Sequence, residues 1–512
     1  MTEKGRVYII GAGPGDPGLI TLRGVQCIRE ADVIIYDHLV SPEILRHAGE
    51  KTRLIYAGKQ GGDHTLSQWE INNLLVAEAR QGAIVARLKG GDPFIFGRGG
   101  EEAEVLREAG IPFEVVPGIS SAVAVPAYAG IPLTHRSHTV SVAFVTGHED
   151  PTKEKSDLDW PTLAGIGTLV FLMGVKNLPA IAENLIRYGK DAATPAALIR
   201  WGTTPDQETL TGTLGNIAQR AEERRFLPPS IFVVGGVVGL RETLNWFETK
   251  PLFGRGVVIT RPEAQAAELS ELLRARGARV INFPVIRIAP PETWDEIDRA
   301  LDRLEGYRWL IFTSANGAAF FFRRLRECGR DIRDLKGIRI ATIGPATASA
   351  VEARGIRVDL VPEEFISEGV VRAFAGEDLR GCRVLLPRAQ EARDVIPEGL
   401  AKMGAEVDIA TAYRTVRSDR NASELMPYFA DEKIDVITFT SPSTVANFLG
   451  IMGPDFRLPS KVRIACIGPV TEAAARKAGL PVDIFQERYT IPGLVDALTA
   501  FPWLVDFPAR RE

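Results

Sequence analysis

Short runs of apolar residues alternate in the first quarter of the chain with stretches whose apolar residues recur every three or four positions. Between residues 6 and 116 the runs VYII, ADVIIY, RLIYAG, AIVARLKG and PFEVV are typical of buried strands. The stretch SQWEINNLLVAEARQG has a helical period, begins with the capping-box pair Ser67 and Glu70, and ends at Gly82. Strands that alternate with helices predict an α/β layer with a mostly parallel sheet.

A second pattern covers residues 138 to 240. The runs TVSVAFVTG, GTLVFLMG, TPAALI and PSIFVVGGVV are rich in threonine and valine, and helical stretches are scarcer between them. This pattern predicts a smaller, mixed α/β lobe. The stretch NWFETKPLFGRG, residues 245 to 256, then indicates a linker into a new domain.

The rest of the chain contains an internal repeat. VVITRPEAQAAELSELLRARGARV is similar to VLLPRAQEARDVIPEGLAKMGAEV, LIFTSANGAAFFF to ITFTSPSTVANFL, and IRIATIGPATASAVEARGIRVDLV to VRIACIGPVTEAAARKAGLPVDIF. Generic α/β similarity explains one such pair, but three pairs in the same order at nearly one spacing favour duplication. We therefore expect two similar α/β lobes with a cleft between them.

Composition narrows the class of protein. The 512 residues are 45% hydrophobic and 25% charged with a net charge of −4, which gives no electrostatic reason to expect nucleic acid or an anionic membrane. The first apolar run is too short for a signal peptide, and no later run approaches membrane-spanning length. The 4 cysteines form no C-x-x-C pair, so we expect reduced thiols in a cytoplasmic protein.

Histidine is confined to the first third of the chain. All 6 histidines lie between His38 and His148, in spacings that match no standard metal motif, so no metal is expected. Everything after His148 must work without imidazole. This excludes a Ser-His-Asp triad from the second part of the chain.

The opening turn, VYIIGAGPGDPGLIT, does not fit a phosphate chain. The dinucleotide fingerprint has glycine at its sixth position, where this chain has Asp16. A carboxylate there would repel a pyrophosphate, and Pro14 lacks the N–H that a phosphate uses. Binding of a dinucleotide is therefore not expected.

A second glycine-rich turn, RLKGGDPFIFGRGGEE, also follows a strand. Gly90 and Gly91 allow close approach of the backbone, Asp92 offers a carboxylate, and neighbouring phenylalanines supply apolar walls. Such a turn suits a neutral or cationic organic ligand, at the strand ends where α/β sheets bind ligands. A merely tight turn would explain the glycines but not Asp92.

Residues 5 to about 248 closely resemble uroporphyrinogen-III C-methyltransferases, tetrapyrrole methylases that use S-adenosylmethionine. VYIIGAGPGDPGLITLRG, RLKGGDPFIFGRGGEEAEVL, VVPGISSA, AYAGIPLTHR and FVTGH carry the resemblance. It implies a homodimer and a cofactor pocket between two lobes, formed by Pro14, Gly90, Gly91, Asp92, Ile95, Ser120, Ser121, Met173 and Gly202. The family commonly has threonine–alanine in place of Ser120–Ser121, and asparagine in place of Trp201.

The same resemblance assigns proton transfer to two residues. Asp37, in YDHLV, would accept the proton that a pyrrole carbon loses as the methyl group arrives. Lys59, in GKQGG, would donate a proton or hold a substrate propionate. The residues alone also allow a helix N-cap for Asp37 and a solvated surface charge for Lys59.

Residues 254 to about 505 resemble uroporphyrinogen-III synthases through VVITRP, FTSANG, IGPATAS, AYRTV, FTSPSTVANF and IACIGPVT. The resemblance implies that the first strand–helix unit packs with the last third of the chain and that strands near 284–289 and 411–416 bridge two lobes. Backbone N–H groups at helix starts would bind substrate carboxylates, with Arg261, Ser441 and Thr471 as further contacts. Tyr413 would help a hydroxyl to leave, although a strand aromatic that packs the hinge explains it equally well.

Together these resemblances predict a two-lobed tetrapyrrole methylase fold followed by a two-lobed, internally duplicated α/β synthase fold. The expected boundaries are 1–131 and 137–248 for the methylase lobes, a linker at 249–254, 255–288 plus 417–505 for synthase lobe 1, and 289–416 for lobe 2 with the bridging strands. The expected function is cyclisation of hydroxymethylbilane to uroporphyrinogen III, followed by two methylations to precorrin-2 for sirohaem or cobalamin. The alternatives are a non-catalytic tetrapyrrole-binding module in the second half, and a methylase for another corrinoid or an RNA base.

Overall fold

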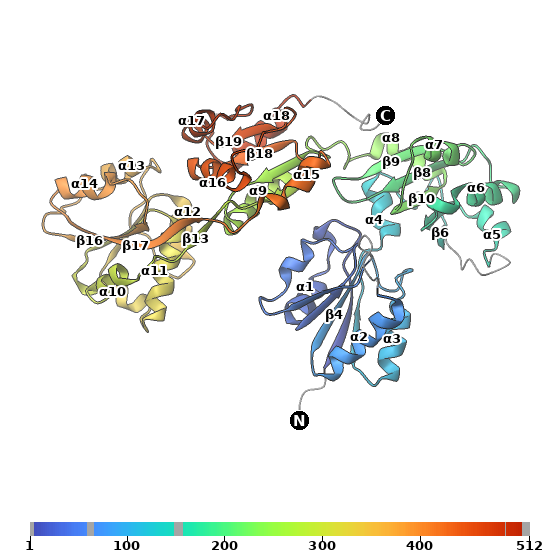
Figure 1. The fold of residues 1–512 in the computed structure, drawn as a ribbon, viewed down its shortest axis with the longest axis horizontal. Helices are drawn as coiled ribbons and strands as arrows, with labels where there is room; N and C mark the ends of the chain where they lie inside the picture. Colours follow the sequence, from blue (N-terminus) through green and yellow to red (C-terminus); the bar gives the residue numbers. More distant parts are fainter. Residues whose placement is uncertain (1–4, 59–65, 148–156, 487, 504–512) are drawn as a thin grey trace. The chain divides into compact units, whose positions relative to one another are not determined.

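The structure is a computed structural model that describes residues 5–58, 66–147, 157–486 and 488–503. The chain forms two compact units, one of Met1–Gly256 with Leu273–Arg279 and one of Val257–Leu272 with Val280–Glu512. Each unit contains two sheets with helices against them (Figure 1).

The first sheet is parallel, in the order β3-β2-β4-β1-β5. Its strands are β1 (Arg6–Gly11), β2 (Val33–Tyr36), β3 (Arg53–Tyr56), β4 (Ile84–Lys89) and β5 (Phe113–Val116). Alternate residues point to opposite faces: Val7 and Ile9 pack with α2 (Gln68–Arg80) and α3 (Gly99–Glu108), while Tyr8 and Ile10 pack with α1 (Leu22–Glu30). Figure 1 shows these helices on the two sides of β4. The predicted parallel layer and the Ser67–Glu70 capping box are confirmed.

The second sheet has both parallel and antiparallel pairs, in the order β6-β7-β10-β8-β9. Its strands are β6 (Val142–Thr146), β7 (Thr168–Leu172), β8 (Pro195–Arg200), β9 (Glu208–Thr213) and β10 (Ser230–Val234). Only the β6–β7 pair is parallel. Its helices are α4 (Ser121–Tyr128), α5 (Trp160–Gly165), α6 (Leu178–Arg187), α7 (Ile217–Glu223) and α8 (Arg241–Leu244). Helix α4 packs on this sheet, because Ala122 and Val125 share an apolar cluster with Val170 and Val233.

One sheet of the second unit joins strands from both ends of that unit, in the order β12-β11-β18-β19. Its strands are β11 (Gly256–Ile259), β12 (Arg279–Asn282), β18 (Val436–Phe439) and β19 (Arg463–Cys466). Strand β11 runs parallel to β18, with Val257 beside Val436. The helices of this lobe are α9 (Glu263–Ala275), α15 (Met426–Ala430), α16 (Pro442–Met452), α17 (Pro469–Lys477) and α18 (Ile491–Ala500).

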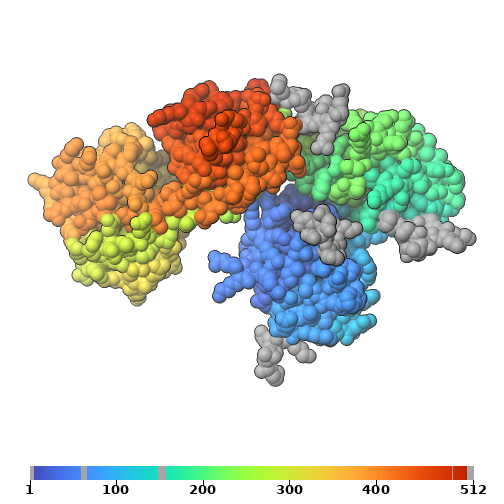
Figure 2. Space-filling model, viewed as in Figure 1, coloured from blue at the N-terminus to red at the C-terminus, as the bar shows by residue number. Residues whose placement is uncertain are grey.

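The other sheet of this unit has the order β13-β17-β16-β14-β15. Its strands are β13 (Ile286–Ala289), β14 (Trp309–Phe312), β15 (Arg339–Thr342), β16 (Arg383–Ala389) and β17 (Glu406–Arg417), and only β13 runs antiparallel to its neighbour. Its helices are α10 (Asp295–Leu301), α11 (Ala315–Glu327), α12 (Pro345–Glu352), α13 (Ser367–Ala373) and α14 (Val395–Lys402). In Figure 2 the lobe with β18 and β19 is coloured mainly deep orange to red, and the lobe with β14 to β16 is coloured yellow to light orange. The domain boundaries stay a prediction.

Candidate functional site

Three loops meet at the carboxyl edge of the first sheet, and their glycines let the backbones touch. The loops follow β1, β4 and β5. A Cβ on Gly118 would lie 2.3 Å from the Gly91 carbonyl oxygen, and one on Gly11 would lie 2.5 Å from the Gly118 Cα. Gly13 and Gly91 also exchange two backbone hydrogen bonds, of 3.2 and 2.7 Å. Backbone therefore forms this edge, and a ligand can approach it closely.

The Asp92 side chain holds the loop after β4 in shape. Its Oδ1 accepts the N–H groups of Phe94 and Ile95 at 2.8 and 3.1 Å, and its Oδ2 accepts the Gly118 N–H at 3.0 Å. The carboxylate therefore stabilises its own loop, as in an Asx turn, and joins it to the loop of Gly118. A ligand contact of Asp92, or of the 38% exposed Ile95, stays a prediction.

Strained backbone gathers at the strand ends of this unit. Among the described residues, seven non-glycine residues have positive φ, and five of them lie in turns after β4, β7 and β8. Those five are Phe96, Arg98, Met173, Trp201 and Thr203. Such conformations persist only where the surroundings hold them, and they concentrate at functional sites. They mark these turns as the candidate site.

Gly202 lies against helix α4. A Cβ on Gly202 would lie 2.3 Å from the Val125 Cγ1, so only glycine fits here. Ser120 caps the same helix, because its Oγ accepts the Ala122 N–H at 3.3 Å, and Ser121 is its first residue. The structure thus brings three predicted residues, Ser120, Ser121 and Gly202, to one helix.

Two apolar side chains stand at the strand ends of the second lobe. Met173 is 52% exposed and Trp201 is 37% exposed. Trp201 has φ 46°, a left-handed conformation that asparagine tolerates better than a bulky aromatic does. The departure from asparagine therefore adds backbone strain next to Gly202.

The opening turn is attached to the second lobe through Asp16. Its backbone N–H donates to Thr203 Oγ1 at 3.0 Å, and its Oδ2 accepts the Tyr128 hydroxyl at 2.7 Å. Its Oδ1 caps the short turn that follows by accepting the Gly18 N–H at 2.8 Å. Burial and the bond to Asp16 raise the pKa of Tyr128 well above its usual value. Asp16 thus links the loop of Pro14 to the turn after β8.

Asp37 lies at the same edge, directly after β2. Its Oδ1 accepts the Leu39 N–H at 3.1 Å and closes a turn. No helix begins there, since the next helical turn starts at Ile44, so the interpretation as a helix N-cap is wrong. A Cβ on Gly90 would lie 2.6 Å from the Leu39 Cβ, which places the Asp37 turn against the glycine-rich turn. Lys59 lies outside the described residues, as do His64 and His148.

A buried charge network lies beneath Asp37. Arg87 and Lys89 on β4 both contact Oε1 of Glu102 on α3, at 3.2 and 2.6 Å. An Arg87 Nη lies 3.8 Å from Asp37 Oδ2, which is an ion-pair distance beyond hydrogen bonding. Burial lowers the pKa of Lys89, and the charge of Arg87 lowers it further. Charge is thus concentrated where β4 reaches the edge.

The second unit presents helix N-termini at its strand ends. Helices α11, α12, α16 and α17 follow β14, β15, β18 and β19. Ser314 and Ser441 are the N-caps of α11 and α16, and Gly344 and Gly468 hold that position before α12 and α17. Both parts of the repeat therefore offer the free N–H groups that suit carboxylates.

Two predicted contacts lie on helices of this set. Ser441 Oγ accepts the Thr444 N–H at 3.3 Å and lies 2.9 Å from Ser443 Oγ. Thr471, in the first turn of α17, is only 4% exposed. Substrate contacts of Ser441 and Thr471 stay predictions.

Tyr413 lies on the long strand β17 and is 8% exposed. Its ring lies over Phe320 of α11, with centroids 6.0 Å apart and planes 28° apart. Its hydroxyl lies 3.1 Å from Ser314 Oγ. The ring of Tyr413 therefore packs against an aromatic side chain, as one of the two interpretations expects, and its hydroxyl has Ser314 as a polar neighbour.

The repeat-related arginines differ in their partners. Arg388 pairs with Asp394 at 2.7 Å and donates to the Arg393 carbonyl at 3.0 Å. Arg261 forms one hydrogen bond among the described residues, to Gln265 Oε1 at 3.2 Å. Burial lowers the pKa of Arg261, and the charge of Glu268 opposes this shift. A half-buried guanidinium that forms no ion pair among the described residues is suited to an anionic ligand.

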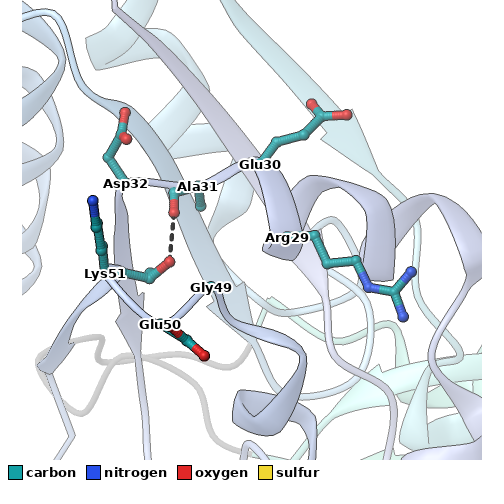
Figure 3. A pocket seen from close by; sticks show the side chains of 8 residues that line it. Arg29, Glu30, Ala31, Asp32, Gly49, Glu50 and Lys51 are labelled. Carbon is teal, nitrogen blue, oxygen red and sulfur yellow. Dashed lines mark hydrogen bonds between the residues drawn. The ribbon is translucent and has the colours of Figure 1, made fainter. Parts of the chain in front are cut away.

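A hollow of about 380 Å³ lies elsewhere on the first unit, lined by Arg29, Glu30, Ala31, Asp32, Gly49, Glu50, Lys51 and Thr52 (Figure 3). Asp32 and Thr52 directly precede β2 and β3, so this hollow lies at the amino ends of the strands. Its Thr52 hydroxyl donates to the Ala31 carbonyl at 2.8 Å. Ligands of α/β sheets bind at the opposite edge, so this hollow is not the candidate site.

Comparison with known proteins identifies the two units. Residues 6–218 match the family model Tetrapyrrole (Corrin/Porphyrin) Methylases, and residues 267–496 match Uroporphyrinogen-III synthase HemD. A porphyrin biosynthesis protein HemD from Ruminiclostridium josui is 39% identical over 97% of this chain and 98% of its own length. The chain belongs to the family that fuses a tetrapyrrole methylase to a uroporphyrinogen-III synthase. We call residues 5–248 the methylase half and residues 257–503 the synthase half.

Relatives of the methylase half carry more specific names. A uroporphyrinogen-III C-methyltransferase from Bacillus subtilis (strain 168) is 43% identical over 70% of this chain and 74% of its own length. An S-adenosyl-L-methionine-dependent uroporphyrinogen III methyltransferase from Methanosarcina barkeri is 56% identical over 47% of this chain and 95% of its own length. The chain is therefore a bifunctional enzyme of tetrapyrrole biosynthesis, as the sequence predicted. None of its described helices has the length and hydrophobicity needed to cross a bilayer.

Several residues around the methylase and synthase sites are not among those predicted from the sequence. Thr203 and Tyr128 connect to Asp16, Glu102 anchors the charge network, and Ser314 contacts Tyr413. A signal existed for Glu102, because RLKGGDPFIFGRGGEE places an acid in the first turn of the helix that follows the strand of Arg87 and Lys89. The other contacts join residues far apart in the sequence, so no local sequence pattern predicts them.

Proposed function

We propose that the synthase half converts hydroxymethylbilane to uroporphyrinogen III and that the methylase half methylates this product twice, to precorrin-2. Two features of one chain carry the proposal. The first is the carboxyl edge of the first sheet lined by Gly11, Gly91 and Gly118, which we call the glycine-walled edge. The second is the duplicated set of helix N-termini. Precorrin-2 would supply sirohaem or cobalamin. We further propose a cytoplasmic homodimer formed through the methylase half.

The glycine-walled edge fits S-adenosylmethionine as the methyl donor. A Cβ on Gly91 would lie 3.6 Å from the Ser121 N and would fill the space between the turn and α4. The carboxylate of Asp92 accepts backbone N–H groups and so keeps the turn in the shape that would hold the donor. The residues that would hold the donor are Pro14, Gly90, Gly91, Asp92, Ile95, Ser120, Ser121, Met173 and Gly202. When bound, S-adenosylmethionine supplies an electrophilic methyl group on its sulfonium.

Methylation of a pyrrole carbon requires that the ring lose a proton, and Asp37 is placed to accept it. Its Oδ1 is held by the Leu39 N–H, while its Oδ2 accepts no hydrogen bond among the described residues. The Arg87 guanidinium lies 3.8 Å from this Oδ2, so a cation faces the oxygen that would accept the proton. Lys59 would donate a proton or hold a propionate.

The synthase half works mainly by positioning. Loss of the hydroxyl from hydroxymethylbilane leaves a cation that the pyrroles stabilise, so no imidazole or metal is needed. The helix N-termini bind substrate carboxylates, with Arg261, Ser441 and Thr471 as further contacts. Tyr413 helps the hydroxyl to leave.

The full chain supplied with hydroxymethylbilane tests this proposal. Without S-adenosylmethionine we expect uroporphyrinogen III, identified by isomer analysis of the oxidised porphyrins. With the methyl donor we expect the absorbance of a dimethylated product. Formation of isomer I alone, the spontaneous product, would show that the second half only binds tetrapyrroles. A lack of methylation of supplied uroporphyrinogen III would point to another methyl acceptor.

A further inference from the structure

The Tyr413 hydroxyl has one hydrogen-bond partner among the described residues, the side chain of Ser314. The two oxygens lie 3.1 Å apart, and either atom can donate. Ser314 is the N-cap of α11, and its Oγ also accepts the Gly317 N–H at 3.0 Å. Because the helix start fixes Ser314 and Phe320 packs on the Tyr413 ring, both ends of the contact are held in place.

The donors and acceptors of this pair leave one O–H free. A serine hydroxyl has one proton and two lone pairs, and the Gly317 N–H takes one of those lone pairs. Serine can therefore still donate its proton to the phenol oxygen. In that arrangement the phenol proton is unused and available to a substrate. A phenol is also a far stronger acid than an aliphatic alcohol.

The repeat provides an internal comparison. Ser441 occupies the matching N-cap on α16, but its neighbour is Ser443, at 2.9 Å. The cap hydroxyl near β17 contacts a phenol, whereas its counterpart contacts another cap-region hydroxyl. Helix capping alone accounts for Ser441 and does not account for the Ser314–Tyr413 contact.

We propose that Ser314 is a positioning residue for Tyr413, one that donates its O–H to the phenol oxygen and leaves the phenol proton directed at the leaving hydroxyl of the substrate. This inference rests on the proposed role of Tyr413 in the synthase half. As the C–O bond of the hydroxymethyl group breaks, the pyrrole nitrogen supplies the electron pair to the carbon. The Tyr413 proton joins the departing oxygen, which leaves as water.

The phenolate that remains accepts the Ser314 hydrogen bond, and hydrogen bonding to a charged form stabilises it. Ring closure then releases a proton from the attacked pyrrole carbon, and this proton restores the phenol. The cycle consumes hydroxymethylbilane and yields the macrocycle and one water, with no other reactant.

The test uses the full-length chain and a double-mutant cycle. The variants are Ser314→Ala, Ser314→Thr, Tyr413→Phe and the double variant Ser314→Ala/Tyr413→Phe. Thr490→Ala is the matched control, because Thr490 caps α18 by accepting the N–H of a glycine at the same helix position, Gly493, at 3.2 Å. Cyclisation of hydroxymethylbilane gives kcat and KM, and methylation of supplied uroporphyrinogen III by the same samples reports an intact chain.

We expect Ser314→Ala to lower kcat for cyclisation about tenfold, the effect of one lost hydrogen bond to a reacting group, with KM changed less than about twofold. Ser314→Thr keeps the hydroxyl and the cap and should retain most of kcat. In the Tyr413→Phe background the alanine substitution should cost less than about twofold. Thr490→Ala should leave kcat unchanged.

Two results would overturn the inference while leaving the role of Tyr413 intact. One is a Ser314→Ala variant with normal kcat beside an impaired Tyr413→Phe variant. The other is the same tenfold loss in both backgrounds, which would show that Ser314 acts without Tyr413. Normal kcat in Tyr413→Phe would instead refute the proposed role of Tyr413 itself, and the inference with it.

Discussion

The two halves place different chemical groups at the carboxyl ends of their strands, where each would meet an anionic tetrapyrrole. In the methylase half, Asp37 stands at the edge of a parallel sheet above the buried charges of Arg87, Lys89 and Glu102. In the synthase half, helix N-termini and hydroxyls occupy the strand ends. The difference fits the two proposed reactions. Proton abstraction would need a held carboxylate, whereas loss of a hydroxyl to a self-stabilised cation would need positioning.

The largest expected effect lies in the methylase half. Asp37→Asn should lower the rate of methylation of supplied uroporphyrinogen III by about a hundredfold or more, because it removes the proposed base. Binding of S-adenosylhomocysteine, measured by calorimetry, should remain. Asp32→Asn is the control: Asp32 lies at the amino end of the same strand, where its Oδ2 accepts the Ile84 N–H at 2.9 Å. Equal losses in both variants would contradict a catalytic role for Asp37.

The glycine-walled edge gives the next effect. Gly91→Ala should weaken binding of S-adenosylhomocysteine at least about tenfold, because its Cβ would enter the space near the Ser121 N. Gly110→Ala controls for backbone strain, since Gly110 has φ +69° against +71° for Gly91 and no atoms within 4 Å of its Cβ position. Both substitutions should destabilise the fold by roughly 1–2 kcal/mol. Unchanged ligand affinity in Gly91→Ala would refute the proposed binding edge.

The repeat-related arginines sharpen the comparison within the synthase half. Arg261→Gln should raise KM for hydroxymethylbilane about tenfold, the effect expected for one lost charge-assisted bond to a substrate carboxylate. Arg388→Gln should leave KM nearly unchanged, because Arg388 already pairs with Asp394. Steady-state kinetics of both variants test this. Equal effects of the two substitutions on KM would contradict the prediction that Arg261 binds the substrate and Arg388 does not.

The smallest effect concerns the link between the methylase lobes. Tyr128→Phe removes the hydroxyl that donates to Asp16 and should destabilise this half by about 1 kcal/mol. Calorimetry should show one unfolding transition lowered by roughly 2–4 °C. The rate of cyclisation should not change. A loss of cyclisation would contradict a role confined to the methylase half.

Much of the fold was predictable because burial imposes a period on the sequence. Along β1, Val7 and Ile9 face the helices on one side of the sheet, and Tyr8 and Ile10 face the helix on the other side. The Ser67–Glu70 spacing marks a helix start. Three recurring units predicted the two similar lobes of the second unit. These are local signals, and they are read directly from neighbouring positions.

The sites were less predictable, for a physical reason. The carboxylate of Asp92 looks like a ligand group in sequence, but a backbone N–H from the loop of Gly118 occupies one of its oxygens. Asp16 looks like a barrier to phosphate, and in the fold it connects two lobes through Thr203. Both contacts join distant positions, so only the folded chain determines which polar atoms remain free for a ligand.

The central claim is that one chain carries out two successive reactions, each with its own site. The most direct measurement supplies hydroxymethylbilane and S-adenosylmethionine to the Asp37→Asn and Tyr413→Phe variants and identifies what accumulates. We predict that Asp37→Asn accumulates unmethylated uroporphyrinogen III, and that Tyr413→Phe slows cyclisation yet methylates supplied uroporphyrinogen III normally. Loss of both activities in either variant would contradict the claim.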